Sequence, residues 1–350
     1  MEPLFNAAKI QFTLNDEIGY EGKSSNVYIA TDHQFEDELV IKRIAKEDVS
    51  DIDEYFKEAK ILYATQHQFV APIHYGCQDD EFIYIAMPLY RNGSLKRRLT
   101  DYSLSVREIL RYSSHILNGL HHIHSKGLLH LDLKPDNILI NDRDEAIITD
   151  FGQSVYLNDD GFGKTGYLYY KYFTPEELRD EHASVQSDIY QFGLTLYQAV
   201  NGIDHFNQQV PEDPFELQDL TEAGAFPDRE DYKYHVPANL RRVINRCLNL
   251  EQVERYSSVL ALQNELNSVD GNIDWVFEED GDTLTWAQSL EDEKERIVVV
   301  KLNENKKFEM DCFRRNLATN KERRCKGHCV AEENTSTIKS IVQKALRNNW

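Results

Sequence analysis

The stretch HLDLKPDN, residues 130–137, decides the fold together with the triplet DFG at residues 150–152. The first stretch supplies a carboxylate at Asp132, an amine at Lys134 and a carboxamide at Asn137. One loop therefore offers a carboxylate, a cation and an oxygen ligand for a metal ion. Transfer of a phosphoryl group to a hydroxyl needs these groups, because that chemistry depends mainly on positioning and on charge neutralisation.

A second carboxylate, Asp150, directly follows residues 146–149 (AIIT), which predict a short strand. Asp150 and Asn137 are then the two expected ligands for a metal ion. The two stretches resemble the catalytic loop and the metal-binding triplet of the eukaryotic-type Ser/Thr protein kinase family. The resemblance implies a bilobal α+β fold, with a β-rich N-lobe and a helical C-lobe, and the use of ATP and Mg²⁺.

Further landmarks of that family occur in the same order. Residues 18–27 (IGYEGKSSNV) resemble the glycine-rich phosphate loop, with one extra residue between the first two glycines and a serine in place of the third. Lys42 resembles the lysine that contacts the α- and β-phosphates. Its expected carboxylate partner is Glu58 on the next predicted helix, with Glu54 as the alternative. The resemblance implies these nucleotide-contacting residues: Ile18, Gly19, Gly22, Ser25, Val27, Val40, Lys42, Met87, Leu89 and Leu139.

Three more motifs follow in the second half of the resemblance. Residues 174–176 (TPE) resemble the Ala-Pro-Glu triplet that ends the activation segment, and residues 188–193 (DIYQFG) resemble the Asp-x-Trp-x-Phe-Gly motif of the central helix. Arg255 fits the buried arginine that pairs with Glu176. The motifs together cover about residues 12–268, and their specificity comes from their order.

The resemblance implies four catalytic residues: Lys42, Glu58, Asp132 and Lys134. Asp132 would orient the substrate hydroxyl and accept its proton, while Lys134 would neutralise charge on the γ-phosphate. Pseudokinases usually lack the phosphate-contacting lysine, the catalytic aspartate or the metal aspartate, and all three are present here. The non-enzymatic alternative is a nucleotide-binding scaffold whose C-terminal region performs the function.

Small-molecule kinases of the aminoglycoside phosphotransferase type are another alternative that shares the ATP machinery. They typically lack counterparts of Lys134, Glu176 and Arg255, so the sequence favours a protein substrate. Lys134 also favours serine and threonine over tyrosine as the residue that accepts the phosphate.

Leu131 stands where many kinases have an arginine that binds the phosphate of a phosphorylated activation segment. We therefore expect the segment, residues 153–173, to be ordered by itself or by the rest of the chain. It holds five tyrosines, Tyr156, Tyr167, Tyr169, Tyr170 and Tyr172, for which aromatic packing is the favoured interpretation. Ser154 and Thr165 are the candidate autophosphorylation sites.

Hydrophobic patterns divide the chain into an N-lobe (1–89), a C-lobe (90–270) and a C-terminal α+β module of unknown role (271–350). Predicted strands cover residues 10–14, 27–30, 39–42 and 82–87, and predicted helices cover 51–66, 106–126, 185–201, 237–248 and 257–267. In the C-terminal module the patterns predict four strands and one helix: 274–277, 284–287, 296–302, 308–313 and the helix 337–347.

Charge and composition limit the class of protein. The net charge of −21 argues against non-specific nucleic-acid binding by the whole chain. Residues 305–350 contain 11 Lys/Arg and 5 Asp/Glu, a net of +6, so residues 1–304 carry −27. The chain shows neither a long apolar run nor a secretory-type start, and five cysteines make no disulfide framework. We expect a cytoplasmic protein that does not enter the membrane.

The C-terminal module has a basic run at residues 321–326. Binding of nucleic acid is one interpretation, and docking on the acidic kinase region or a solvated edge is favoured. The module is expected to bind a partner protein or to dock on the kinase. Cys312, Cys325, His328 and Cys329 are poorly spaced for zinc, so ordinary thiols are favoured over a metal site.

Overall fold

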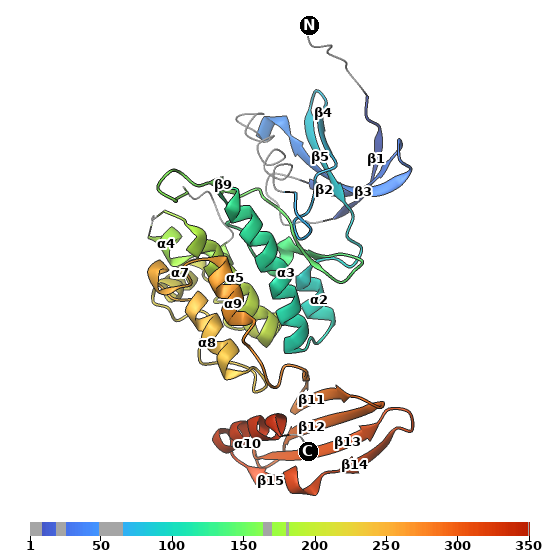
Figure 1. Ribbon diagram of the computed structural model, residues 1–350, viewed down its shortest axis with the longest axis vertical. Helices are drawn as coiled ribbons and strands as arrows, with labels where there is room; N and C mark the ends of the chain where they lie inside the picture. Colours follow the sequence, from blue (N-terminus) through green and yellow to red (C-terminus); the bar gives the residue numbers. More distant parts are fainter. Residues whose placement is uncertain (1–8, 19–25, 49–65, 164–169, 180–181, 349) are drawn as a thin grey trace.

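The computed structural model describes residues 9–18, 26–48, 66–163, 170–179, 182–348 and 350. A five-stranded antiparallel sheet comes first, a group of helices follows, and a six-stranded sheet with one helix ends the chain (Figure 1). The predicted α+β fold, with a β-rich part before a helical part, is confirmed.

The N-terminal sheet has the strand order β1-β2-β3-β5-β4. Its strands are β1 (Phe12–Ile18), β2 (Asn26–Asp32), β3 (Asp37–Ala45), β4 (Tyr75–Gln78) and β5 (Phe82–Pro88). One face buries Ala30, Leu39 and Ile41, and the other buries Ile44 and Ile83. The predicted strands are thus found, and β4 was missed because it is short and contains Gly76. The helix predicted over residues 51–66 lies, except for its last residue, outside the described residues.

The C-lobe is mainly helical. Its helices are α2 (Leu95–Asp101), α3 (Val106–Ser125), α4 (Pro175–Leu178), α5 (Val185–Asn201), α6 (Ile203–Asn207), α7 (Pro214–Glu222), α8 (Ala238–Cys247) and α9 (Val259–Leu266). Two small two-stranded sheets accompany them: β6 (Leu128–Leu129) pairs with β9 (Val155–Tyr156), and β7 (Ile138–Ile140) forms a hairpin with β8 (Ala146–Ile148). A capping box of Ser105 and Glu108 starts α3, and Gly127 follows its end with φ +72°. The predicted helices 106–126 and 185–201 are confirmed to within one residue.

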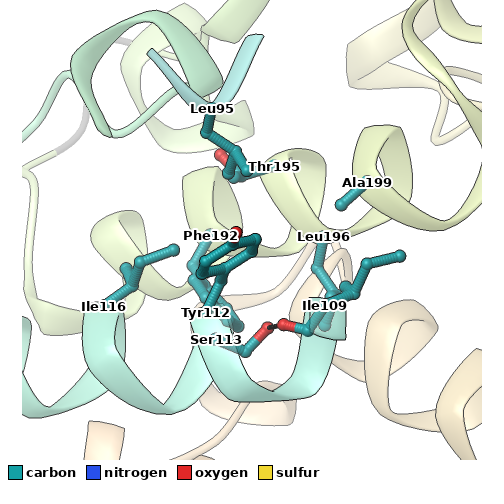
Figure 2. A pocket seen from close by; sticks show the side chains of 9 residues that line it. All are labelled: Leu95, Ile109, Tyr112, Ser113, Ile116, Phe192, Thr195, Leu196 and Ala199. Carbon is teal, nitrogen blue, oxygen red and sulfur yellow. Dashed lines mark hydrogen bonds between the residues drawn. The ribbon is translucent and has the colours of Figure 1, made fainter. Parts of the chain in front are cut away.

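The C-lobe core forms where α3 packs against α5. Figure 2 shows Ile109 and Tyr112 of α3 beside Phe192 and Leu196 of α5. The cavity that these side chains line has a volume of about 10 Å³. A space of that size holds at most about one water molecule. The interior is therefore closely packed, and this cavity is not a ligand site.

A buried ion pair joins distant segments of the C-lobe, as the sequence predicts. Arg255 donates from Nη1 and Nη2 to the two carboxylate oxygens of Glu176, at 2.9 and 2.8 Å, and both side chains are essentially inaccessible. The remaining guanidinium N–H groups bond to main-chain carbonyls of Gln186, Asn249 and Leu250. All five donors are thus used, which is the condition for a tolerable buried charge.

The C-terminal module is one sheet covered on one face by a helix. The elements are β10 (Val276–Asp280), β11 (Thr283–Leu290), β12 (Lys294–Leu302), β13 (Phe308–Asn316), β14 (Lys321–Arg324), β15 (Val330–Glu333) and α10 (Thr335–Arg347). The order is β10-β11-β12-β13-β14, and β15 also pairs with β13. The four predicted strands correspond to β10, β11, β12 and β13, and the prediction missed β14 and β15. All four residues of β14 are charged and exposed, so the strand has no alternating apolar pattern to find.

The module has its own core and contacts the C-lobe. Trp286, Val298 and Cys312 of the sheet pack with Ile338 and Val342 of α10. Its junction with the C-lobe uses ring stacking of His235 on Phe277 and of Tyr234 on Trp286, and ion pairs of Arg107 with Asp274 and of Lys233 with Glu279. The basic run takes no part in these contacts and lies on β14 and just after it.

Two cysteines of the module lie close together. Cys312 and Cys329 contact each other, since the Cys312 N–H donates to Cys329 Sγ at 3.4 Å. Within the described part of the chain, no group of three His, Cys, Asp or Glu side chains is arranged to hold a metal ion. The same residues contain no helix with both the length and the apolar character needed to cross a bilayer.

We predict a large stability difference between two neighbouring arginines. Arg255→Ala leaves the buried Glu176 carboxylate without its partner, so the free energy of unfolding should fall by about 3–5 kcal/mol. Arg179→Ala removes a pair with Glu251 that is 32% and 63% exposed, and should cost less than about 1 kcal/mol. Urea denaturation of the two variants tests this. Equal losses would show that the buried pair does not stabilise the C-lobe.

Candidate active site

The loop at residues 130–137 is held by a buried carboxylate in the first turn of α5. Asp188 accepts hydrogen bonds from the main-chain N–H groups of His130 and Leu131, at 2.9 and 2.8 Å, and lies 2.7 Å from Nε2 of His124. Burial alone would raise the pKa of Asp188, but these partners outweigh burial and the pKa is lowered. The carboxylate therefore stays charged and fixes the start of the loop.

Two further polar residues of α5 hold the same loop. Gln191 accepts from the Leu133 N–H at 2.9 Å and donates to the Leu131 carbonyl at 3.0 Å. The Thr195 hydroxyl donates to the Leu133 carbonyl at 3.3 Å. Sequence reasoning missed His124, Gln191 and Thr195. For Gln191 and Thr195 the available signal was a polar side chain among the apolar residues of α5, a helix that is buried on nearly all sides. His124 belongs to α3, which carries many polar residues, so its sequence context offered no such signal.

Asp132 lies at the centre of a small polar cluster. The Asn137 amide nitrogen donates to its Oδ2 at 2.7 Å and to its main-chain carbonyl at 2.9 Å, and Lys134 Nζ lies 3.0 Å from the same Oδ2. Burial raises the pKa of Asp132, and the positive charge of Lys134 opposes part of that rise. The loop thus brings together the carboxylate, the amine and the carboxamide that the sequence singled out.

Asp150 lies beside the lysine of the N-terminal sheet. Lys42 Nζ is 3.2 Å from Asp150 Oδ1, and the positive charge of Lys42 is the main cause of the lowered pKa of Asp150. Asp150 has a left-handed backbone conformation, with φ +63°. Phe151 is buried, and its ring and the His130 ring meet edge to face with their centroids 4.9 Å apart. Burial of the phenylalanine turns the neighbouring carboxylate outward, and the Asp150 side chain remains 45% exposed.

The register of the N-terminal sheet places five predicted nucleotide-contacting residues on one face. Ile18 lies opposite Val27, and Val27 lies opposite Lys42, in a row across three strands. Val40, two residues before Lys42 on β3, lies opposite Met87 of β5. Because side chains alternate between the two faces of a strand, Val40 and Met87 lie on the same face as Lys42. An apolar surface with one lysine thus covers this side of the sheet.

The other predicted contact residues are placed differently. Leu139 is half-buried on β7 between two buried isoleucines, and Leu89 is half-buried directly after β5. Four predicted residues lie outside the described residues: Gly19, Gly22, Ser25 and Glu58. The predicted pair of Lys42 with Glu58 therefore stays a prediction.

The activation segment starts against an apolar cluster that contains Leu131. Leu131 is fully buried with Leu129 and Ala183, and Val155 packs against them. The Ser154 hydroxyl donates to the His130 carbonyl at 3.2 Å. The segment is therefore held to the loop by apolar contacts and by a neutral hydrogen bond.

The tyrosines of this segment differ in how far their side chains are buried. Tyr172 is buried, and its hydroxyl donates to Gln198 at 3.0 Å, whereas Tyr156 is 49% exposed. The interpretation of aromatic packing thus holds for Tyr172 and is wrong for Tyr156. Tyr167, Tyr169 and Thr165 lie outside the described residues.

Comparisons with known proteins agree with this geometry. Residues 12–266 match the protein kinase domain family. The chain is 29% identical over 297 residues to the serine/threonine-protein kinase PknD of Chlamydia muridarum, an alignment that covers 73% of this chain and 31% of that protein. It is 28% identical over 292 residues to PknD of Chlamydia caviae, with 73% and 31% covered. A Clostridium acetobutylicum protein named probable serine/threonine-protein kinase is 25% identical over 268 residues, with 75% and 40% covered.

The chain spans about a third of the length of the PknD proteins that it matches. The match over residues 12–266 nevertheless includes the loop, the metal-binding triplet and the buried ion pair described above. The chain belongs to the protein kinase domain family.

Proposed function

We propose that this chain is an ATP-dependent serine/threonine protein kinase that uses Mg²⁺. The observation that carries the proposal is the cluster of Asp132, Lys134 and Asn137 in one loop, with Lys42 and Asp150 paired at 3.2 Å. The names of the relatives support serine and threonine as acceptors. A protein substrate is supported by Lys134 and by the buried pair that anchors α4.

The residues present fit a bound magnesium ion. The Asn137 amide nitrogen is committed to Asp132, so its carboxamide oxygen points away from that carboxylate. Asp150 presents a partly exposed carboxylate with a lowered pKa. A carboxylate and a carboxamide oxygen, completed by phosphate oxygens, suit Mg²⁺, which would neutralise charge on the phosphates. We assign the metal to Asn137 and Asp150.

The remaining roles follow from position. The apolar face with Ile18, Val27, Val40 and Met87 would cover the adenine, and Lys42 would contact the phosphates. Asp132 would accept the proton of the attacking hydroxyl, and its raised pKa makes it a better base than an ordinary aspartate. Lys134 would neutralise charge on the transferred group.

We also propose that the activation segment is ordered without a phosphate. The position that often carries an arginine holds Leu131, which is buried among apolar side chains. A phosphate on the segment would find no guanidinium there. Thr165 remains the better candidate for autophosphorylation, because the Ser154 hydroxyl is already bonded to the His130 carbonyl.

Two further expectations complete the proposal, and one alternative to it remains. Residues 1–89, 90–270 and 271–350 would act as an N-lobe, a C-lobe and an accessory module. The protein would work in the cytoplasm. The alternative, a scaffold that binds nucleotide without transferring phosphate, shares the fold and differs only in catalysis.

The first prediction separates the enzyme from the scaffold. Purified protein incubated with γ-labelled ATP and Mg²⁺ should label itself or a generic protein substrate. Asp132→Ala should lower the rate by about 10²–10⁴-fold, because it removes the base. Asp142→Ala, an exposed aspartate in the same region, is the control and should leave the rate unchanged. Equal, minimal labelling by wild type and Asp132→Ala would favour the scaffold.

The second prediction concerns pH. Asp132 must be deprotonated to act as a base, and its raised pKa places the acidic limb of the kcat/KM profile at higher pH than for an ordinary aspartate. Lys134→Gln removes a charge that lowers this pKa, so the limb of the residual activity should move further toward neutral pH. Lys96→Gln, whose partner is Asp136, is the control. A limb that moves toward lower pH would contradict the assignment.

The third prediction concerns phosphorylation of the activation segment. Protein treated with a phosphatase, and shown by mass spectrometry to carry no phosphate, should keep most of its initial rate. The reason is that Leu131 and its apolar neighbours hold the segment. Complete loss of activity after the treatment, with recovery on rephosphorylation, would show that a phosphate orders the segment.

A further inference from the structure

We propose that the C-terminal module binds a phosphorylated serine or threonine in an extended peptide. The feature that carries this inference is a row of three arginines on the face of the sheet that α10 covers. Arg296 lies opposite Arg314, and Arg314 lies opposite Arg323, on β12, β13 and β14. Directly opposite residues have Cβ atoms about 4.5–5.5 Å apart, and like charges in such pairs are destabilising. We call Arg314 and Arg323 the arginine pair.

Arg296, on β12 at the end of the row away from the sheet edge, is held by several contacts. Its Nη1 donates to the Asn348 carbonyl at 2.9 Å, at the C-terminal end of α10, and another nitrogen bonds to Gln288. Its guanidinium also lies over the rings of Trp275 and Trp350, at 5.5 and 5.9 Å. Arg296 is therefore a buried structural residue, and it leaves the arginine pair next to a fixed positive charge.

The arginine pair is exposed and lacks a carboxylate partner within the described part of the chain. The contrast with the opposite face of the same strands is clear. There, Arg315 pairs with Glu295 and Glu322, and Arg324 pairs with Asp311. One face thus neutralises its guanidinium groups internally, while the other leaves the arginine pair available to an external anion.

The surroundings of the pair are also positive. In the adjacent row on the same face, Lys294 lies opposite Asn316, which lies opposite Lys321. Lys294 lies 3.5 Å from Asp292, in the exposed turn before β12. The face therefore offers two planar guanidinium groups and a further amine, which suits a single phosphate dianion.

Protection of a sheet edge does not explain the arrangement. Charged residues on an edge strand prevent pairing with other chains, and this would account for Lys321 and Arg323 on β14. Arg314 lies on β13, which has neighbours on both sides, so edge protection gives it no role. A positive pair that spans an inner and an edge strand fits an anion held across both.

The edge strand also offers a way to bind the peptide itself. β14 and β10 stand at opposite ends of the strand order, and β10 carries contacts to the C-lobe. An extended peptide can add to such an edge by main-chain hydrogen bonds, with its phosphate over the arginine pair. A long nucleic acid is disfavoured by the net charge of −21. The proposal does not depend on the catalytic activity proposed above, because phosphopeptides from any kinase would bind.

The test uses the full chain with Asp132→Ala, so that no phosphate is transferred. Fluorescence anisotropy is measured with two labelled pools of degenerate peptides that differ only in a central phosphoserine or serine. We expect the phosphorylated pool to bind at least about tenfold more tightly, since charge-assisted hydrogen bonds are stronger than neutral ones. The variant Arg314→Gln/Arg323→Gln should bind both pools equally weakly.

A matched control removes two positive charges elsewhere in the module. Lys301→Gln/Lys306→Gln changes two exposed lysines away from the arginine pair, and should bind like the parent protein. Thermal unfolding shows whether each variant is folded. The proposal fails if the folded arginine variant binds the phosphorylated pool like the parent, or if the parent does not distinguish the pools. If a single-stranded oligonucleotide binds as tightly as the phosphorylated pool, or more tightly, the ligand of the module is nucleic acid and the phosphopeptide proposal is wrong.

Discussion

The buried carboxylate of Asp188 is the constraint on which the candidate active site depends. A charge without access to water is tolerated only when donors surround it. Here the donors are the His124 ring and the main-chain N–H groups of His130 and Leu131. Leu131 has φ +60°, a left-handed conformation that is uncommon outside glycine. The need to satisfy Asp188 therefore fixes the backbone that presents Asp132.

In the proposed mechanism, two aspartates with different environments have different roles. Asp132 is buried and its pKa is raised, whereas the pKa of Asp150 is lowered by Lys42. A group that holds a proton more readily suits proton transfer, and a group that stays charged suits a metal ion. Asp188 of α5 holds the loop that carries Asp132, and Lys42 of the N-terminal sheet pairs with Asp150. The helix and the sheet therefore set the two environments.

Motif residues could be predicted from sequence because chemistry restricts both their type and their spacing. Glu176 and Arg255 were found in this way although 78 positions separate them, since the family order identifies each. The supporting residues His124 and Gln191 were missed, because the partner of a polar side chain on a helix becomes clear only when distant segments have folded together. The strand β14 was missed because it is exposed on both faces and so lacks the apolar alternation that marks a half-buried strand.

The charge asymmetry of the sequence suggested that a basic C-terminal segment docks on an acidic kinase region. At the junction the signs are reversed: Arg107 and Lys233 belong to the C-lobe, and their partners Asp274 and Glu279 belong to the module. The acidic start of the module therefore contacts the C-lobe, and aromatic stacking supplements the ion pairs. Because docking uses the acidic side, and Arg324 is the β14 arginine that pairs with Asp311, the junction leaves the charges of Arg314 and Arg323 unneutralised. An excess of positive charge that neither packing nor docking neutralises is best explained by an anionic ligand.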